Sequence, residues 1–365
     1  MTTTLDDLRR FAVGRTLFPP TTLGEAIEKL GFVQADPIRS PARAQDLTLR
    51  HRAEGYRAGD LERHYHQLGI EEDFFINYGF VTRALHELMH PRHGNWSPWS
   101  RAQGKGAARI LKFVRERGAV HPREVDEKFA HGTVTNYWGG SSNATTHLLD
   151  LMHYRGLLRI VRRDAGIRVY GVREPSATIA KRERAARVDA LIDIAVGKYA
   201  PLPAQSLTQL VARLRYAVPQ WNSELKPALE RARQRLAHVR IDRNEWYWPA
   251  TESVAGNGSL DSVRLLAPFD PLVWDRRRFE MFWGWPYRFE AYTPVKKRSF
   301  GYYALPLLWR DRVIGWGNLS VTEGTLDAKI GFVGGRRPRE REFTRELDAE
   351  LTRFRAFVGL DGRSS

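Results

Sequence analysis

The sequence contains no cysteine, which excludes disulfide bonds, thiol chemistry and cysteine-ligated metals. Any zinc site would therefore have to use histidine and carboxylate ligands. The chain also has no apolar run long enough to span a membrane, and the segment from Met1 to Phe18 has no signal-peptide core. We therefore expect a cytoplasmic protein without a membrane partner.

Acidic residues are the scarcer charged class: 42 Asp and Glu stand against 58 Lys and Arg, which gives a formal charge of +16. This excess favours an anionic partner, and nucleic acid is the commonest one. A membrane surface would need a basic amphipathic anchor or a lipidation motif, and the sequence shows neither. With 42% hydrophobic residues, the 365-residue chain can bury two to four compact cores.

Residues 102–172 carry the clearest local pattern. Apolar spacing predicts three short helices, the third capped by Asn143 and ended by Gly156. Two short strands, 157–161 and 167–172, follow around a tight turn. Three helices and a β-hairpin predict a winged helix, in which the third helix enters the DNA major groove.

A looser copy of this pattern follows, with helices expected at 182–196, 207–214 and 225–237 and a second hairpin of strands 239–241 and 246–248. Two helices expected at 5–15 and 22–30 suggest a further unit, although no clear wing accompanies them. From Val263 onward, aromatic and β-branched runs alternate with turn residues and predict a small antiparallel sheet or barrel. The expected strands are 287–292, 300–309, 313–321 and 328–333, and the expected closing helix is 340–358.

The fold class predicted from these patterns is α+β: tandem winged-helix (helix-turn-helix) domains followed by a small C-terminal antiparallel β-barrel or sheet domain. The predicted domains are a winged-helix-like domain at 1–100, winged helices at 101–175 and 176–255, and the β domain with its closing helix at 256–365.

Basic residues gather beside the first predicted hairpin and in a later loop. A single such cluster is ordinarily a solvated face, but its association with a recognition helix and a wing favours contact with DNA phosphates. The residues expected to contact DNA in these clusters are Arg155, Arg159, Arg162, Arg163, Lys296, Lys297 and Arg298.

The segment from His86 to His90 matches the H-E-x-x-H signature of zinc hydrolases, with Glu87 as the general base. Pro91 argues against this function, because a residue before proline is pushed out of the helical region. No clear third ligand follows at a usual distance. We therefore expect an ordinary helix end, no metal and no cofactor, and keep the zinc hydrolase as the weakest alternative.

Gln34 and Asp36 flank a small residue directly after an apolar turn. In an extended segment their side chains would point the same way, so an amide and a carboxylate could hold and activate one water molecule. The ordinary interpretation is a loop in which Asp36 caps the next element. The residues alone leave both interpretations open.

Several motifs together resemble a known family. They are GFVQADPI (31–38), ARAQDL (42–47), LAPFDPLVWDR (266–276), YRFEAY (287–292) and GYYALP (301–306). On these residues the chain resembles, over nearly its whole length, the winged-helix DNA glycosylases of the AlkZ/YcaQ type. Enzymes of that type repair bulky alkylated bases and unhook interstrand crosslinks.

The resemblance implies a catalytic Gln-x-Asp motif formed here by Gln34 and Asp36, with the neighbouring Arg39 and Arg43 contacting DNA. It also implies tandem winged helices and a β domain around a basic channel. One departure concerns the crosslink-unhooking branch, which carries an aromatic-x-His pattern near residues 78–80. This chain has Phe80 at the histidine position, so the range of lesions is left open.

The implied chemistry suits these residues. An N7-alkylated purine is already cationic and leaves readily, while a carboxylate such as Asp36 stabilises the oxocarbenium-like sugar and takes a proton from the attacking water. No lysine near Gln34 is well placed for catalysis, so the sequence gives no support for lyase chemistry, and a lysine distant in sequence is left open. We therefore expect a monofunctional DNA glycosylase that hydrolyses the N-glycosidic bond of N7-alkylpurines in double-stranded DNA.

We expect this enzyme to act as a monomer associated with the nucleoid. The main alternative is a non-enzymatic winged-helix DNA-binding protein or transcriptional regulator, which would usually be a symmetric dimer on a palindromic site.

Overall fold

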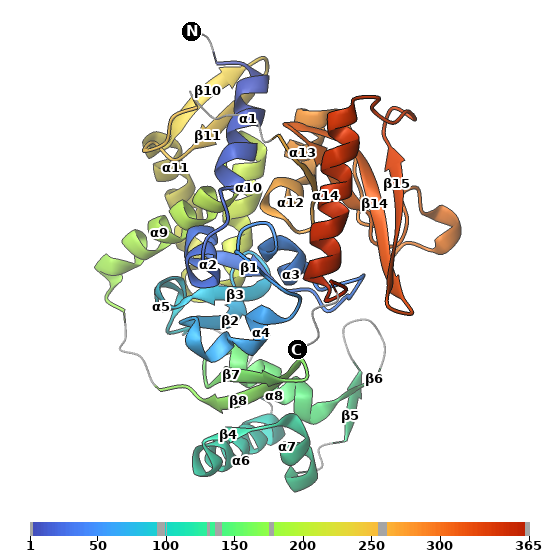
Figure 1. Cartoon of the computed structure of the whole chain (residues 1–365). Coiled ribbons are helices and arrows are strands. Elements are labelled where there is room, and N and C mark those ends of the chain that lie inside the picture. The colour runs from blue at the N-terminus through green and yellow to red at the C-terminus, as the bar shows by residue number, and fades with distance from the viewer. Residues whose placement is uncertain are drawn as a thin grey trace. The chain divides into compact units, whose positions relative to one another are not determined.

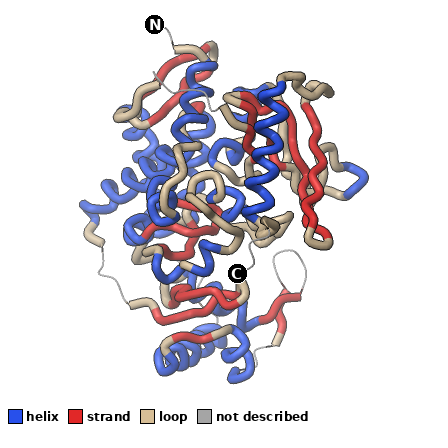
Figure 2. The backbone as a smooth tube through the Cα atoms, viewed as in Figure 1, coloured by secondary structure: helices blue, strands red, loops and turns tan. Residues whose placement is uncertain are grey.

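The computed structural model describes residues 3–92, 99, 101–129, 132–135, 141–174, 179–254 and 261–361. The chain folds into two compact units, each assembled from separate stretches of sequence (Figure 1). The first unit comprises Met1–Leu61, Ile192–Val211 and Leu229–Ser365, and the second comprises Glu62–Leu191 and Ala212–Ala228. Helices and short strands alternate in both units (Figure 2). The predicted mixed α and β architecture is thus confirmed, whereas the four-domain division stays a prediction.

The first unit begins with two helices, α1 (Leu5–Thr16) and α2 (Leu23–Leu30), close to the bounds predicted for them. Each starts with a capping box, in which Thr4 pairs with Asp7 and Thr22 pairs with Glu25. The strand β1 (Phe32–Gln34) and the helix α3 (Ala44–Leu49) follow, and α4 (Asp60–Arg63) lies at the boundary of the two units. The capping boxes therefore place the candidate motif directly after a well-defined helix.

A four-stranded antiparallel sheet forms the C-terminal part of the first unit. Its order is β12 (Val263–Leu265), β13 (Leu305–Trp309), β14 (Arg312–Thr322) and β15 (Thr325–Phe332). The helix α14 (Arg341–Phe357) packs beside it through Phe343, whose ring lies 5.7 Å from that of Trp309 (Figure 1). Within the described residues β12 and β15 do not pair, so the sheet is open: the predicted small antiparallel sheet is confirmed, and its barrel alternative is wrong.

Two further expectations for this region are wrong. Residues 287–292 form no strand, and the strand expected from residue 300 begins at Leu305. The intervening loop is held instead by side-chain contacts: the Glu290 carboxylate accepts the amides of Ser299 and Phe300 at 2.9 and 2.7 Å. An aromatic run that packs inward from a loop resembles a strand in its composition, which explains the error.

Two short helices in the first unit were not predicted. These are α12 (Pro271–Trp274) and α13 (Arg276–Trp283), capped by Asp270 and Asp275. Each cap accepts a backbone amide at its helix start, from Leu272 and Arg278 respectively. The two caps position Trp274 between the helices, and this residue reappears in the candidate site.

The second unit contains a hairpin that was also not predicted, β2 (Ile70–Phe74) with β3 (Tyr78–Thr82), followed by α5 (Arg83–Met89). Its remaining helices and strands are α6 (Arg101–Arg117), β4 (Ala119–Val120), α7 (Pro122–Phe129), β5 (Thr133–Thr135), β6 (Ser141–Asn143), α8 (Ala144–Tyr154), β7 (Leu158–Asp164) and β8 (Ile167–Val172). Three of these strands form a sheet in the order β4-β8-β7.

The helices and hairpin predicted between residues 102 and 172 are present near their expected bounds. Asn143 caps α8 by accepting the amide of Thr146 at 3.0 Å, and Gly156 has a positive φ of 76° just after the helix end. One core joins helices and sheet, with Ile110, Val114, Leu149, Met152, Ile160 and Tyr170 among its buried members. These segments of chain therefore fold around a common apolar centre.

The later helices and hairpin also lie close to the predicted ranges. They are α9 (Lys181–Tyr199), α10 (Ala204–Arg213), α11 (Leu225–Arg235), β10 (Ala237–Ile241) and β11 (Asn244–Trp248), with β11 pairing to β9 (Leu202–Pro203). Short 3-10 turns complete the chain at Tyr65–Gln67, Leu214–Tyr216, Pro219–Glu224 and Val295–Lys297. No helix in the described part of the chain combines the length and apolar character that crossing a bilayer requires.

Candidate active site

The segment with the predicted catalytic pair begins where α2 ends. Gly31 ends the helix at φ 64°, and a Cβ added there would lie 2.9 Å from a methyl carbon of Ile194. The chain then enters β1, whose last residue is Gln34, and Asp36 follows in the loop. The extended backbone expected at Gln34 is therefore present.

The amide of Gln34 is held in one orientation. Its side chain is buried, with 6% exposed, and its Oε1 accepts a hydrogen bond of 3.1 Å from Nε1 of Trp274. An indole N–H can only donate, so the atom facing it must be the amide oxygen. The Nε2 of Gln34 is therefore the atom left to meet a ligand, and it can only donate.

Trp274 is itself fixed from another part of the first unit. The ring of Tyr199, at the end of α9, lies 4.7 Å from the Trp274 ring at an angle of 34°. The Asp270 carboxylate that caps α12 also pairs with the buried Arg52, with Nη1 and Oδ2 2.8 Å apart. These contacts anchor the short helix that presents the indole to Gln34.

Asp36 is half-buried, and its carboxylate is oriented by the backbone that follows. Oδ1 accepts the amide of Ile38 at 2.9 Å, and the Asp36 amide donates to Oε1 of Gln45 at 3.3 Å. Burial raises the pKa of Asp36, an effect that the Ile38 hydrogen bond opposes. A carboxylate with a raised pKa is a stronger base than an exposed aspartate, which suits proton transfer from water.

The charge of this carboxylate acts on two tyrosines. The pKa of Tyr292 and that of Tyr303 are raised by burial first and then by the negative charge of Asp36. Tyr303 is 2% exposed, and among the described residues its hydroxyl has no hydrogen-bond partner. Tyr292 is 78% exposed. The site thus combines a buried spare hydroxyl with an aromatic ring open to solvent.

The basic turn predicted to contact DNA lies between these tyrosines in sequence. Lys296 and Lys297 are exposed, and Arg298 is held by a 2.7 Å hydrogen bond from its Nε to the carbonyl of Thr293. The Arg298 guanidinium also lies 5.1 Å from the ring centre of Tyr302. Because the charge of Asp36 acts on both Tyr292 and Tyr303, the turn between them in sequence belongs to the same part of the first unit as the motif.

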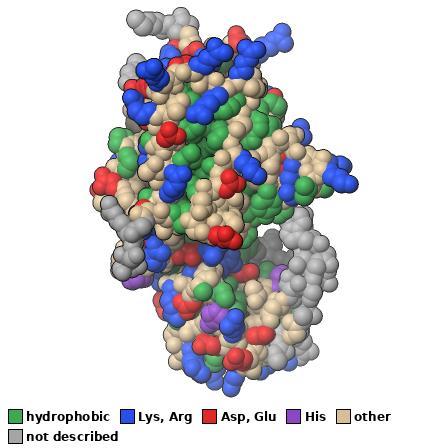
Figure 3. All heavy atoms as spheres, turned by 45° about the vertical axis from the view of Figure 1, so that its right-hand side comes forward, with side chains coloured by type: hydrophobic (Ala, Val, Ile, Leu, Met, Phe, Trp, Pro, Cys, Tyr) green, Lys and Arg blue, Asp and Glu red, His purple; other side chains and the backbone are tan. Residues whose placement is uncertain are grey.

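The two arginines that follow the motif differ in exposure. Arg39 is exposed, whereas Arg43 is half-buried at the start of α3. On the face of the molecule in Figure 3, Lys and Arg side chains are interspersed with acidic and hydrophobic ones. The positive excess of the chain therefore does not form one unbroken patch on that face.

A lysine far away in the sequence reaches the strand that carries Gln34. Nζ of Lys198 donates to the carbonyl of Phe32, and the lysine side chain is buried. Burial, with a smaller contribution from Arg52, lowers the pKa of Lys198 to about 7. No local pattern in the sequence indicates that Lys198 lies near the motif, because its contact with Phe32 joins residues 166 positions apart.

In the second unit, two of the predicted DNA-contacting arginines are engaged by the acidic strand β2. Arg159 pairs with Glu71, and Arg163 pairs with the fully buried Glu72 at 2.6 Å. Burial alone would raise the pKa of Glu72, but Arg163 and Arg168 hold it below its usual value. Carboxylates thus already compensate the charges of Arg159 and Arg163, and the contacts of these two arginines with DNA stay predictions.

The other two arginines of this group are differently placed. Arg162 is half exposed and pairs with the nearby Asp164 at 3.0 Å. The Arg155 guanidinium lies 4.0 Å from the ring centre of Trp99.

Phe80 stands where the crosslink-unhooking branch carries histidine. It is fully buried in β3 against Tyr65, with ring centres 6.2 Å apart.

The H-E-x-x-H segment forms the end of α5, and both histidines face Asp73. One nitrogen of each histidine and one carboxylate oxygen lie within 4.8 Å of one another, so Asp73, His86 and His90 could in principle ligate a metal. Arg92 pairs with Asp73 at 2.7 Å, and Nη1 of Arg173 lies 2.7 Å from Nε2 of His86. Two guanidinium groups in contact with the ligand atoms oppose the binding of a cation.

The whole chain has a counterpart among solved structures. It is similar to DNA glycosylase AlkZ of Streptomyces sahachiroi, with a TM-score of 0.60 and 13% identity over 98% of this chain and 97% of that one. The family model "DNA glycosylase AlkZ-like" matches residues 27–357. The chain therefore belongs to the AlkZ-like DNA glycosylase family, as the motifs indicated, and its general function is that of a DNA glycosylase in DNA repair.

Three residues of the site could not be assigned a function from the sequence. Trp274 and Tyr303 lie within motifs that carry the resemblance, but nothing in their spacing connects them to Gln34 or Asp36. Lys198 lies in a helix whose sequence has no special pattern. Each is brought to the motif by contacts between distant parts of the chain.

Proposed function

We propose that the enzyme hydrolyses the N-glycosidic bond of N7-alkylated purines in duplex DNA, with Gln34 and Asp36 as its catalytic pair. The observation that carries this proposal is the fixed orientation of the Gln34 amide. Trp274 occupies Oε1, so Nε2 can donate to the oxygen of a water molecule, while the Asp36 carboxylate accepts that water's proton. A donor and an acceptor two residues apart could together hold one nucleophilic water.

The reaction balances with these groups alone. The bond between C1′ and the purine nitrogen breaks, and its electron pair neutralises the positive charge of the alkylated base. The sugar gains oxocarbenium character, which the Asp36 carboxylate stabilises in its half-buried setting. Water attacks C1′ and gives its proton to Asp36. The pKa of Tyr303 is raised, so its hydroxyl is neutral and can donate a hydrogen bond to the water or the sugar.

Lys198 does not alter this hydrolytic scheme. A bifunctional glycosylase needs an amine that attacks C1′. The Lys198 side chain is buried, and its Nζ donates a hydrogen bond to the Phe32 carbonyl, so it is not free to attack. We therefore propose monofunctional chemistry. Borohydride should trap no covalent complex with DNA, and trapping that disappears in Lys198→Met would overturn this part of the proposal.

For DNA contact, we propose the exposed turn Lys296–Arg298, Arg39 and Arg43 in the first unit. The exposed Tyr292 beside Asp36 supports this placement, because aromatic rings stack on unpaired or displaced bases. In the second unit, the element order and common core of α6 to β8 support a winged helix whose α8 enters the major groove. Arg155 and Arg162 lie at its edge.

The range of lesions follows from the same residues. The phenyl ring of Phe80 has no proton donor or acceptor to replace the histidine of the crosslink-unhooking branch, and it is fully buried. We propose that N7-monoadducts are the principal substrates and that crosslink unhooking is a weak activity. We further propose that the protein works as a monomer on nucleoid DNA in the cytoplasm. Its gel-filtration elution volume with and without duplex would test the oligomeric state.

The deciding experiment measures base release from a duplex with one N7-methylguanine. Wild type should release the base, while Asp36→Asn and Gln34→Ala should lose most of the rate and still bind the duplex. Asp348→Asn, an exposed carboxylate on α14, is the matched control and should keep full activity. If wild type binds duplex but releases no base from this adduct, a bulkier one or a crosslink, the regulator becomes the better interpretation.

A further inference from the structure

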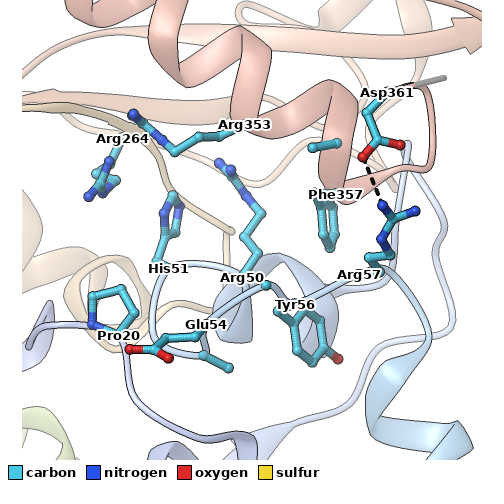
Figure 4. Close-up of a pocket in the computed structure, with 13 residues that line it drawn as sticks. Pro20, Arg50, His51, Glu54, Tyr56, Arg57, Arg264, Arg353, Phe357 and Asp361 are labelled. Carbon is cyan, nitrogen blue, oxygen red and sulfur yellow. Dashed lines mark hydrogen bonds and ion pairs between the residues drawn. The ribbon is translucent and has the colours of Figure 1, made fainter. Parts of the chain in front are cut away.

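A second candidate site lies in the first unit, in a cavity of about 640 Å³ where α3 ends beside the last turns of α14. Figure 4 shows Arg264, Arg353, Arg50 and His51 gathered on one side, and Arg57 joined to Asp361 on the other. This volume is in the range of small-molecule sites. Nothing in the proposed glycosylase mechanism uses these residues.

Three arginines on this side share one carboxylate. Glu350 is fully buried, and its oxygens lie 2.5 Å from Arg50, 3.0 Å from Arg353 and 4.0 Å from Arg264. One negative charge against three positive ones leaves an excess of two at the cavity wall. Burial lowers the pKa of Arg50 and of Arg264, which shows that this excess sits in a poorly solvated place.

One donor at the wall is unsatisfied. The Arg50 side chain is 3% exposed, and among the described residues its Nε has no hydrogen-bond partner. Its Nη2 is used by Glu350 and by the carbonyl of Leu265 at 2.9 Å. A buried guanidinium N–H without an acceptor costs free energy, so the positive charge of Arg50 is only partly compensated behind the cavity wall.

His51 adds an acceptor rather than a charge. Its Nε2 lies 2.9 Å from the carbonyl of Leu265, so Nε2 carries the hydrogen and Nδ1 is bare. Burial, and then the neighbouring Arg50 and Arg264, lower the pKa of His51 well below its usual value. The ring is therefore neutral near pH 7 and can accept a hydrogen bond from a ligand hydroxyl.

The remaining walls are partly acidic and partly aromatic. Arg57 is matched by Asp361 at 2.7 Å, and Glu54 lines the side near Pro20. The rings of Tyr56 and Phe357 stack with centres 6.3 Å apart and form an apolar wall. The positive excess is thus confined to the Arg264 and Arg353 side, with room beyond it for an organic group.

This cavity is distinct from the proposed active site. Gln45, at the start of α3, contacts the Asp36 amide, whereas Arg50 follows the last residue of the same helix. We propose that the cavity binds a phosphate group, held by the guanidinium groups of Arg264 and Arg353 with the buried charge of Arg50 behind them. The phosphate can belong to a small phosphorylated molecule or to the DNA backbone, and guanidinium groups recognise both in the same way.

The test is calorimetric titration of the full chain with inorganic phosphate and with pyrophosphate at constant ionic strength. Wild type should bind one equivalent, and Arg264→Gln and Arg353→Gln should each weaken binding about tenfold. Arg345→Gln is the matched control, because this arginine lies on α14 but is 70% exposed and outside the cavity. It should bind like wild type.

A second measurement covers variants that lose stability. The rise in Tm on replacing chloride with phosphate should be present in wild type and the control and absent in both cavity variants. Duplex binding separates the two sources: weaker binding by Arg353→Gln assigns the phosphate to DNA, and unchanged binding assigns it to a free molecule. No phosphate binding by wild type, or equal binding by all four proteins, would overturn the proposal.

Discussion

Nε1 of Trp274 donates a 3.1 Å hydrogen bond to Oε1 of Gln34, across 240 positions of sequence. This contact decides which end of the amide faces a ligand. If Trp274 is a positioning residue, replacing it should slow base release by about tenfold through loss of one oriented hydrogen bond, without abolishing it. The variant is Trp274→Phe, measured as kcat on the N7-methylguanine duplex.

The matched control is Trp283→Phe. Trp283 makes the same type of bond, from its indole Nε1 to the carbonyl of Asp311 at 2.9 Å, away from the motif. It should lose stability to a similar degree and keep its kcat. Equal losses of kcat in the two variants would mean that Trp274 acts only through the general stability of the unit.

The second prediction concerns the pH dependence of base release. The carboxylate of Asp36 must be ionised to accept a proton, and burial raises its pKa. The rate should therefore fall as pH drops through a value above 3.8, the ordinary pKa of aspartate. Rates measured from pH 4 to 8 should show this acidic limb in wild type and no such limb in the residual activity of Asp36→Asn. A limb that persists in the variant would assign it to another group.

The third prediction separates a structural arginine from an exposed one. Arg163→Gln leaves the buried Glu72 without its principal partner and should lower the free energy of unfolding by about 3 kcal/mol or more. Arg162→Gln should cost less than about 1 kcal/mol, because Arg162 is half exposed. Urea unfolding measures both.

Duplex binding gives the second half of this comparison. If Arg162 contacts a phosphate, Arg162→Gln should reduce the slope of log K against log salt by about 1.

The double variant Arg163→Met/Glu72→Met should regain much of the stability that Arg163→Gln loses, because it removes both buried charges. A double variant less stable than Arg163→Gln would mean that the pair itself is net stabilising.

The fourth prediction follows from Lys198, whose pKa in the folded state is about 7 against 10.5 for an ordinary lysine. Between these values the unfolded chain binds a proton that the folded chain does not. The free energy of unfolding should therefore rise with pH from about 7 to 10.5, by about 5 kcal/mol in total. Lys198→Met should lack this part of the slope in chemical unfolding at pH 7, 8, 9 and 10. Parallel curves for the two proteins would contradict the lowered pKa.

The fifth prediction concerns the H-E-x-x-H segment. Because Arg92 and Arg173 contact the would-be ligands, we expect no stoichiometric zinc in the purified protein and no rise in Tm on adding zinc. Metal analysis of wild type and His86→Ala decides the matter. One equivalent of zinc in wild type that disappears in His86→Ala would restore a metal site.

The helices and strands that could be predicted are those whose pattern lies within a few neighbouring residues. The helices expected at 5–15 and 22–30, and the helix expected after the Ser/Asn-rich start at 141–143, begin within a few residues of those observed, where local caps at Thr4, Thr22 and Asn143 fix their starts. The hairpin β2–β3 was not predicted because Glu71, Glu72 and Asp73 suggest an exposed loop. Their arginine partners lie 19 to 91 positions further along the chain.

The candidate site shows the same division. The spacing of Gln34 and Asp36 suggested a shared water, because alternation along an extended segment is a local property. The contributions of Trp274, Tyr303 and Lys198 depend on packing between distant segments, and no pattern within the motif encodes it. Aromatic residues around 287–304 were assigned to strands because composition does not distinguish a strand from a packed loop.

The indole that orients Gln34 belongs to a segment near the other end of the chain, and that segment is steadied in turn by Tyr199. Grafting the three-residue motif onto another scaffold would thus transfer its chemical groups without their alignment. A nascent or proteolysed chain that exposes Gln34 and Asp36 before residue 274 is in place would lack the partner of the Gln34 amide oxygen. We therefore expect such a fragment to release alkylated bases more slowly than the complete chain.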